Sequence, residues 1–153
     1  MIQNPNTFTG EYSYTVDPKG RVNIPAKFRQ VLSLENNNTF AITKGMDQCI
    51  WVYPLVEWNK VLLQLREQGS STVNRAFARQ YSRFTSMVAY DKQGRILLTS
   101  ELIKFANIHR NVSIIGMINK IEIWNPDLLE DLDNKISDNN KDAFNELAEK
   151  IIL

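Results

Sequence analysis

The segment Val16-Asp17-Pro18-Lys19-Gly20-Arg21-Val22-Asn23-Ile24 has a second copy at Tyr90-Asp91-Lys92-Gln93-Gly94-Arg95-Ile96-Leu97-Leu98. Each copy has an apolar residue, an aspartate, two variable positions, a glycine, an arginine and an alternating apolar run. This pattern is typical of two strands joined by a tight turn. The aspartate, glycine and arginine of the second copy each lie 74 residues after those of the first. The repeat predicts two similar modules, and we expect the duplicated turn to be the functional element.

The segments around each turn follow the same order in both halves of the chain. A strand, a returning strand, a short helix and two further strands are predicted from alternating apolar residues and turn residues. In the first half these segments are 11–16, the strand starting at Val22, 26–32, 39–43 and 50–53. In the second half they are 86–90, 95–98, 100–105, 112–116 and 120–124. The sequence therefore predicts a mainly β fold with helices, an α+β protein.

The remaining segments have the apolar spacing of amphipathic helices. Two helices are expected between the modules, over 55–69 and 73–83, and one or two in the tail, divided near 137–140. We therefore expect a first module at 11–57, a helical connector at 58–84, a second module at 85–128 and an acidic helical tail at 129–153. Arg75, Arg79 and Arg83 recur on one face of the connector, which is either a solvated face or a surface for DNA phosphate or acidic groups.

The charge is distributed unevenly along the chain. Its net value is +1, but residues 125–153 have eight acidic residues and three lysines, a charge of −5, which leaves +6 on residues 1–124. A moderately basic body with an acidic tail favours a nucleic-acid partner. No apolar run is long enough for a membrane helix, so we expect a cytoplasmic protein. Cys49 and His109 are the only residues of their types, which excludes a disulfide and a Cys/His zinc site; Cys49 is expected to be a small core residue.

The residue type at each position of the duplicated turn can be explained by its chemistry. Gly20 and Gly94 permit a positive backbone φ angle, and Asp17 and Asp91 are suited to capping the turn or holding the neighbouring arginine. These four residues are expected to shape the turn. Arg21 and Arg95, with Lys19 and Lys92 beside them, form two small cationic tips. Such side chains bind DNA phosphates, and arginine reads guanine in the major groove.

Two other readings of the turn stay open. Aspartates from equivalent loops of a duplicated chain suggest a carboxylate dyad that shares a proton, but the basic neighbours favour two ionised carboxylates. We therefore predict no enzyme and no catalytic residue. In the third reading, aspartate and arginine lock the turn by an ion pair, and the protein is an oligomeric interaction module whose function lies in its arginine-rich helix and tail.

A set of segments closely resembles the MraZ family and covers nearly the whole chain to about residue 128. They are Gly10-Glu11, Asp17-Pro18-Lys19-Gly20-Arg21, Ile24-Pro25-Ala26-Lys27-Phe28-Arg29, Trp51-Val52-Tyr53-Pro54, Glu57-Trp58, Asp91-Lys92-Gln93-Gly94-Arg95-Ile96-Leu97 and Ile123-Trp124. The duplicated motif, an aspartate with an arginine four residues later, is specific for that family.

The resemblance implies a bacterial transcription regulator of the AbrB-like superfamily, in which two swapped-hairpin modules form a pseudo-symmetric β-barrel. It also implies ring-shaped homo-oligomers that bind short repeated DNA boxes upstream of the division and cell-wall gene cluster, usually as repressors on the nucleoid, with no cofactor, metal or reaction. The DNA-facing positions of the family match Lys19, Arg21, Lys92 and Arg95, and more weakly Lys27 and Arg29. Lys27 aligns with Glu101 and Pro25 with Thr99. We therefore expect unequal tips, with the first dominating binding.

Overall fold

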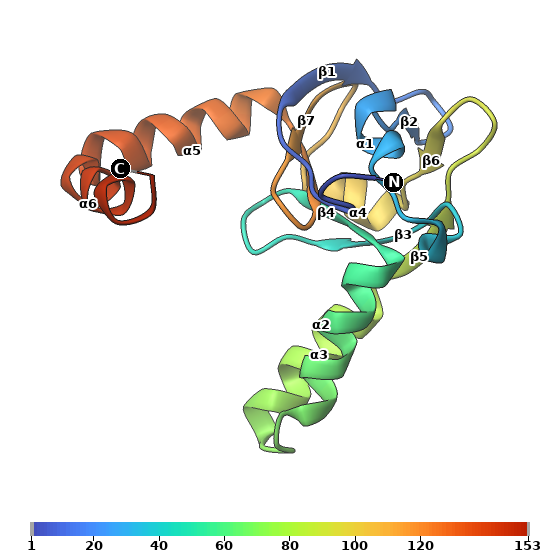
Figure 1. The fold of residues 1–153 in the computed structure, drawn as a ribbon, viewed down its shortest axis with the longest axis horizontal. Helices are drawn as coiled ribbons and strands as arrows, with labels where there is room; N and C mark the ends of the chain where they lie inside the picture. The colour runs from blue at the N-terminus through green and yellow to red at the C-terminus, as the bar shows by residue number, and fades with distance from the viewer. Residues whose placement is uncertain (1, 153) are drawn as a thin grey trace.

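The computed structural model describes residues 2–152 as a β body with two helical arms (Figure 1). The first half contains β1 (Glu11–Thr15), β2 (Arg21–Asn23), α1 (Ala26–Gln30), a 3₁₀ helix η1 (Leu34–Asn36), β3 (Thr39–Lys44) and β4 (Ile50–Pro54). The helices α2 (Leu55–Glu67) and α3 (Thr72–Phe84) follow. The second half contains β5 (Ser86–Ala89), β6 (Arg95–Leu97), α4 (Ser100–Phe105), β7 (Asn111–Gly116) and β8 (Ile121–Trp124), and α5 (Pro126–Asn139) and α6 (Lys141–Ile151) form the tail. The predicted order of strands and helices is confirmed.

The strands of the two halves are interlocked. Six strands form one sheet in the order β1-β7-β8-β4-β3-β5, and β2 and β6 form a separate two-stranded ribbon. All these pairings are antiparallel. The first strand of each half pairs with a strand of the other half, β1 with β7 and β5 with β3. Neither half can therefore complete its sheet without the other.

The expectation of a β-barrel is wrong, because the six-stranded sheet is open. Its edges are β1 and β5, and each of these strands is followed by one of the two predicted turns. After the turn the chain leaves the sheet, and β2 pairs with β6. Among residues 2–152, no pairing joins the edge strands β1 and β5 to each other. The fold is a mixed α/β structure with an antiparallel sheet.

The main core lies between the large sheet, the ribbon and the short helices. Val22 and Ile96 are directly opposite each other in the ribbon, and both side chains are buried. They pack with buried side chains from both halves, among them Phe28, Ile42, Leu102 and Ile114. Burial of each such side chain contributes about 1.5–3 kcal/mol. The core holds the ribbon, and with it the two turns, in a fixed place.

Cys49 is also buried, and burial raises the pKa of its thiol, as expected for a core residue.

The segment between α1 and β3, which includes η1, contains a buried polar connection. Asn36 is fully buried; its amide donates to the Asn6 side-chain oxygen over 2.7 Å and its own oxygen accepts from the Val56 backbone N–H over 2.9 Å. That N–H lies in the first turn of α2, where helix donors lack partners within the helix. Asn36 therefore fixes the start of α2 against the body, which the sequence pattern did not predict.

Glu122 is a buried side chain held between two tryptophans. Its oxygens accept hydrogen bonds from the indole Nε1 atoms of Trp51 and Trp124, each over 2.9 Å. Trp51 lies on β4 and the other two residues lie on β8, so these bonds reinforce the pairing of strands from the two halves. Both polar oxygens are thereby satisfied inside the protein.

We expect Glu122→Gln to lower the free energy of unfolding by about 1–3 kcal/mol. The amide oxygen can still accept from one indole, but the amide N–H₂ group then faces the other donor. Urea denaturation followed by tryptophan fluorescence measures the change. Glu101→Gln, at an exposed position of α4, is the matched control and should have almost no effect. Equal stability of the two variants would show that the indole bonds contribute nothing.

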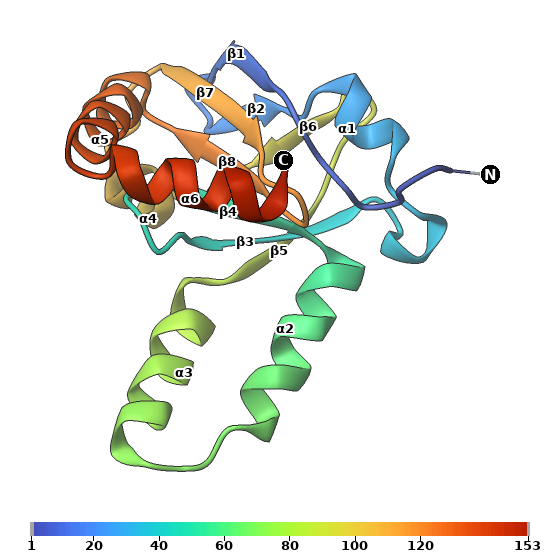
Figure 2. The same cartoon turned by 60° about the vertical axis from the view of Figure 1, so that its left-hand side comes forward.

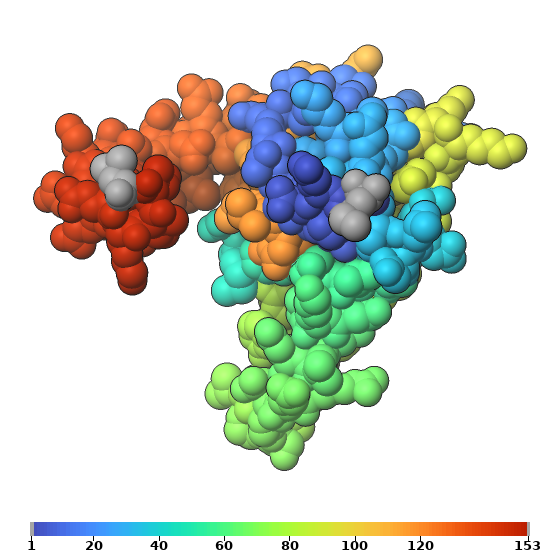
Figure 3. All heavy atoms as spheres, viewed as in Figure 1, coloured from blue at the N-terminus to red at the C-terminus, as the bar shows by residue number. Residues whose placement is uncertain are grey.

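Two helical arms project from the body (Figures 1 and 2). We call α2 and α3 the connector arm and α5 and α6 the tail arm. The tail break that the sequence placed near 137–140 lies at Asn140, between α5 and α6. Figure 3 shows both arms standing away from the packed body on different sides. No helix among residues 2–152 combines the length and apolar character required to cross a membrane.

Candidate nucleic-acid interface

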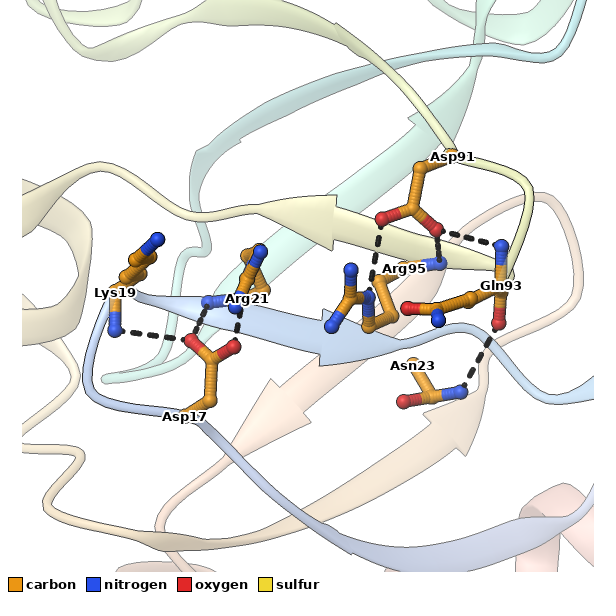
Figure 4. A network of polar contacts seen from close by, with 7 residues as sticks. All are labelled: Asp17, Lys19, Arg21, Asn23, Asp91, Gln93 and Arg95. Atoms are coloured by element: carbon orange, nitrogen blue, oxygen red, sulfur yellow. Dashed lines mark hydrogen bonds and ion pairs between the residues drawn. The ribbon is translucent and has the colours of Figure 1, made fainter.

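The first turn is organised by the carboxylate of Asp17. Oδ1 accepts hydrogen bonds from the backbone N–H groups of Lys19, over 3.0 Å, and Arg21, over 2.8 Å. Oδ2 is 2.6 Å from Nε of the Arg21 guanidinium (Figure 4). The backbone N–H of Gly20 donates to the Asp17 carbonyl over 2.9 Å and closes the turn. One side chain thus fixes both the backbone of the turn and the direction of its arginine.

The second turn repeats this arrangement. Oδ1 of Asp91 accepts from the backbone N–H groups of Gln93, over 2.9 Å, and Arg95, over 3.0 Å, and Oδ2 is 3.0 Å from Nε of Arg95. The Gly94 backbone N–H donates to the Asp91 carbonyl over 2.9 Å. The ion pair that one reading of the sequence proposed is therefore present in both turns. It orients the arginine and leaves its terminal Nη groups outside this bond.

Both glycines have a backbone conformation that L side chains rarely adopt, with φ of +90° at Gly20 and +80° at Gly94. The space around them differs. A Cβ on Gly94 would lie 2.6 Å from the guanidinium carbon of Arg29. A Cβ on Gly20 would lie 3.1 Å from the Leu98 carbonyl oxygen, and its nearest side-chain atom would be a methyl group of Ile103 at 3.4 Å. Arg29 and Ile103 are separated by the repeat distance of 74 residues. The second turn is therefore backed by a cation and the first by an apolar side chain.

The two arginines lie on one face of the ribbon. Arg21 is opposite Leu97 and Arg95 is opposite Asn23, while Val22 and Ile96, on the alternate positions, face the core. The side chains of Arg21 and Arg95 are 33% and 26% exposed. Figure 4 shows each arginine beside its own aspartate, one pair toward each end of the ribbon. The fold thus combines two cationic groups from distant parts of the sequence into one surface.

The lysines occupy inequivalent positions. Lys19 matches Gln93 at the repeat distance, and Lys92 matches Pro18. Both lysines are exposed. Lys27 is exposed on α1. We propose that these side chains add phosphate contacts around the two arginines, because flexible ammonium groups bind phosphate as point charges.

Arg29 is integrated into the fold more than the other predicted site residues. Its Nε donates to the Ile24 carbonyl over 3.1 Å, and its guanidinium carbon lies 5.8 Å from the centre of the Tyr90 ring. Asn23 connects the two turns, a contact that the sequence pattern did not predict. Its amide donates to the Gln93 carbonyl over 3.3 Å (Figure 4). Its only sequence signal was its place within the repeat, where the other copy has Leu97. The two turns are therefore unequal.

Both aspartates are held in the ionised form. The hydrogen bond from the Arg21 backbone N–H, followed by the contacts of the Arg21 side chain, lowers the pKa of Asp17 below its ordinary value of 3.8. The Arg95 backbone N–H is likewise the largest influence that lowers the pKa of Asp91. Each carboxylate is bound by its own turn, which disfavours one proton shared between them. No cluster of three potential metal ligands lies among residues 2–152.

These pKa shifts predict how acid affects stability. A carboxylate whose pKa is lower in the folded protein stabilises the fold fully above its unfolded pKa, and loses this contribution as the pH falls through the folded value. We expect Asp17→Asn/Asp91→Asn to be less stable than the original chain at about pH 7, with the difference shrinking at about pH 2.5. Thermal unfolding across this range measures the difference. A difference that stays constant with pH would contradict the role assigned to the carboxylates.

The fold and the site place this protein in one class: internally duplicated β proteins with interlocked halves and two matching aspartate–arginine turns. The chain belongs to the MraZ family: residues 7–80 and 83–150 match the family described as "MraZ protein, putative antitoxin-like". It is 36% identical over 146 residues to the "Transcriptional regulator MraZ" of Carboxydothermus hydrogenoformans. The aligned residues cover 95% of this chain and 96% of that relative. Proteins of the same name from Clostridium tetani and Moorella thermoacetica are 37% and 38% identical, covering 94% and 95% of this chain and 96% of each relative.

Proposed function

We propose that this protein is a sequence-specific DNA-binding transcription regulator that acts in the cytoplasm, on the nucleoid. It binds repeated DNA boxes upstream of the division and cell-wall gene cluster as a ring of identical chains, and it represses transcription there. The single observation that carries the proposal is that Arg21 and Arg95 lie on the same face of the ribbon. The names of the relatives, all transcriptional regulators, support it.

The chemistry of the two turns fits DNA. A guanidinium has five N–H donors, and the aspartate bond to Nε uses one of them in each turn. The Nη groups remain for phosphate or for O6 and N7 of guanine. Because Asp17 and Asp91 fix the arginines in place, less side-chain entropy is lost when DNA binds. The ion pair is therefore a positioning device for the DNA contact.

The cross-pairing of strands supports two further parts of the proposal. β1 pairs with β7 and β5 with β3, so each half contributes a strand to the sheet of the other. We assign the modules to AbrB-like swapped hairpins on this basis. Residues 2–152 of one chain present two aspartate–arginine turns, which limits the affinity of a single copy. Several linked copies on repeated boxes raise the effective concentration of each turn at its site.

A second candidate function is an oligomeric protein-interaction module with little affinity for DNA. The observation that favours it is that Nε of each arginine already has a partner within its own turn. In this case the arginines stabilise the turns of the fold, and the connector arm and the tail arm carry the protein-binding function. The two candidates differ in whether binding to DNA depends on salt and on sequence.

A gel-shift titration across a salt series distinguishes them. The probe is a promoter fragment with spaced repeats, and the competitor is a fragment of equal length and composition with the repeats scrambled. We expect tighter binding to the repeats, with an affinity that falls linearly with salt on logarithmic axes. Equal binding to both fragments would exclude the sequence-specific regulator, and no shift at low salt would favour the interaction module.

A further inference from the structure

A groove runs between the two helices of the connector arm. Its apolar lining includes Val61 and Leu65 from α2 and Val73 and Phe77 from α3, and its volume is about 620 Å³. A second, almost entirely apolar hollow of about 250 Å³ continues toward the body and reaches Trp51. The proposed DNA contact uses none of these side chains. The groove is therefore an apolar surface without an assigned role.

The groove exposes side chains that proteins normally cover. Val73 is 76% exposed and Phe77 is 47% exposed. Contiguous exposed apolar surface of this kind, with polar residues at its rim, marks an interaction site. Arg75 lies at the loop end of the same groove. An occupant with an apolar face and acidic flanks matches this lining.

The helix α6 has such a face. Phe144, Leu147 and Ile151 follow one another at spacings of three and four residues and form one stripe. They are 48%, 50% and 72% exposed. The eleven residues of α6 span about 16 Å, and the thirteen-residue helices of the connector arm span about 20 Å. The stripe therefore fits within the length of the groove.

The two arms have opposite charges. Residues 55–84 contain five basic and two acidic residues, a net charge of +3, and residues 125–153 have a net charge of −5. The helix α6 contributes three acidic and two basic residues to this charge, and the rest lies on α5. Opposite charges steer two surfaces together and disfavour the pairing of two like arms. In Figures 1 and 2 the arms leave the body on different sides, so a chain does not seat its own α6 in its own groove. A second copy of this chain can supply the occupant.

We propose that α6 of one copy lies in the groove between α2 and α3 of a neighbouring copy. The contact is head-to-tail, because the two copies contribute different surfaces, and repetition of such a contact closes a ring when the rotation permits. The inference rests on the proposed ring assembly and identifies its interface. It also assigns a common role to the arms, which the DNA-contacting turns leave unexplained.

Chemical cross-linking of the full-length protein tests this interface. Cys49 is buried, so Val73→Cys and Leu147→Cys each introduce one accessible thiol. We expect a short bismaleimide to join the two variants into a covalent dimer when they are mixed, and to yield much less dimer with either variant alone. Leu34→Cys, at a position that is 95% exposed and outside both arms, should not cross-link to Leu147→Cys.

Sedimentation of the original chain, run in parallel, separates the possible failures. Assembly without cross-linking between Val73→Cys and Leu147→Cys would overturn the proposed interface and leave the ring intact. A monomer at every concentration would overturn both the proposed interface and the proposed ring. The substitution Leu147→Asp is expected to weaken assembly at least about tenfold, because it places a charge against apolar side chains, whereas Leu34→Asp leaves assembly unchanged. Equal assembly of these two variants would also reject the interface.

Discussion

The double substitution Arg21→Ala/Arg95→Ala is expected to reduce the affinity of this protein for the proposed repeated DNA boxes by about a hundredfold. Each well-placed arginine contact contributes about 1–3 kcal/mol, and about 1.4 kcal/mol corresponds to a factor of ten. Both side chains lie on the exposed face of the ribbon between β2 and β6. Fluorescence anisotropy with a labelled DNA fragment measures the loss.

Two comparisons make this result specific. Lys104→Ala/Lys135→Ala removes the same charge from exposed positions outside the two turns and outside α6, and it should bind DNA almost as well as the original chain. Arg21→Lys/Arg95→Lys keeps the charge but loses the planar donor group, so it should retain general affinity and lose discrimination between sequences. Circular dichroism verifies that each variant is folded. Unchanged affinity of a folded alanine variant would refute the assignment of the two turns.

Gly116→Ala is expected to destabilise the protein by about 3 kcal/mol. A Cβ at this position would lie 2.5 Å from the backbone nitrogen of Thr9 and 2.6 Å from the carbonyl carbon of Phe8. This segment cannot move without cost, because Phe8 is buried and exchanges backbone hydrogen bonds of 2.8 and 3.0 Å with Ile118. Chemical denaturation at equilibrium measures the free energy of unfolding.

Gly69→Ala is the matched control. This glycine lies in the loop between α2 and α3, and an added Cβ would come no closer than 3.6 Å to the Asn74 side chain. Its substitution should change stability by less than about 0.5 kcal/mol. A similar effect at both positions would mean that the cost arises from the loss of glycine flexibility and not from the close approach of residues 8–9.

The order of strands and helices could be predicted because the repeat exposes it. The offset of 74 residues between Asp17 and Asp91 also relates contacts in the structure: Ile24 N–H donates to the Gly94 carbonyl, and Leu98 N–H donates to the Gly20 carbonyl. The open sheet was not predictable from alternation alone, because alternation shows which face of a strand is buried and not which strand lies beside it. The closed barrel was expected from the family resemblance.

The turns could also be predicted from their residues, since the roles of aspartate and glycine depend on local backbone geometry. Contacts between residues far apart in the sequence could not be predicted in this way. Arg29 and Gly94 lie far apart in sequence, yet the guanidinium fills the space beside the glycine. Asn36 lies in a run of three asparagines, a polar composition typical of a surface loop, but it is buried and holds the start of α2. Both features depend on tertiary packing, which a single sequence does not display.

The most direct test of the central proposal, that the duplicated turn faces DNA, is site-specific photo-cross-linking. Lys19→Cys and Lys92→Cys each place one accessible thiol on a turn, because Cys49 is buried, and a benzophenone maleimide attached there reacts with whatever lies beside it. We predict covalent adducts with bound DNA from both turn variants and none from Lys135→Cys on the tail arm. Retention of DNA binding without adducts from either turn would contradict the proposal.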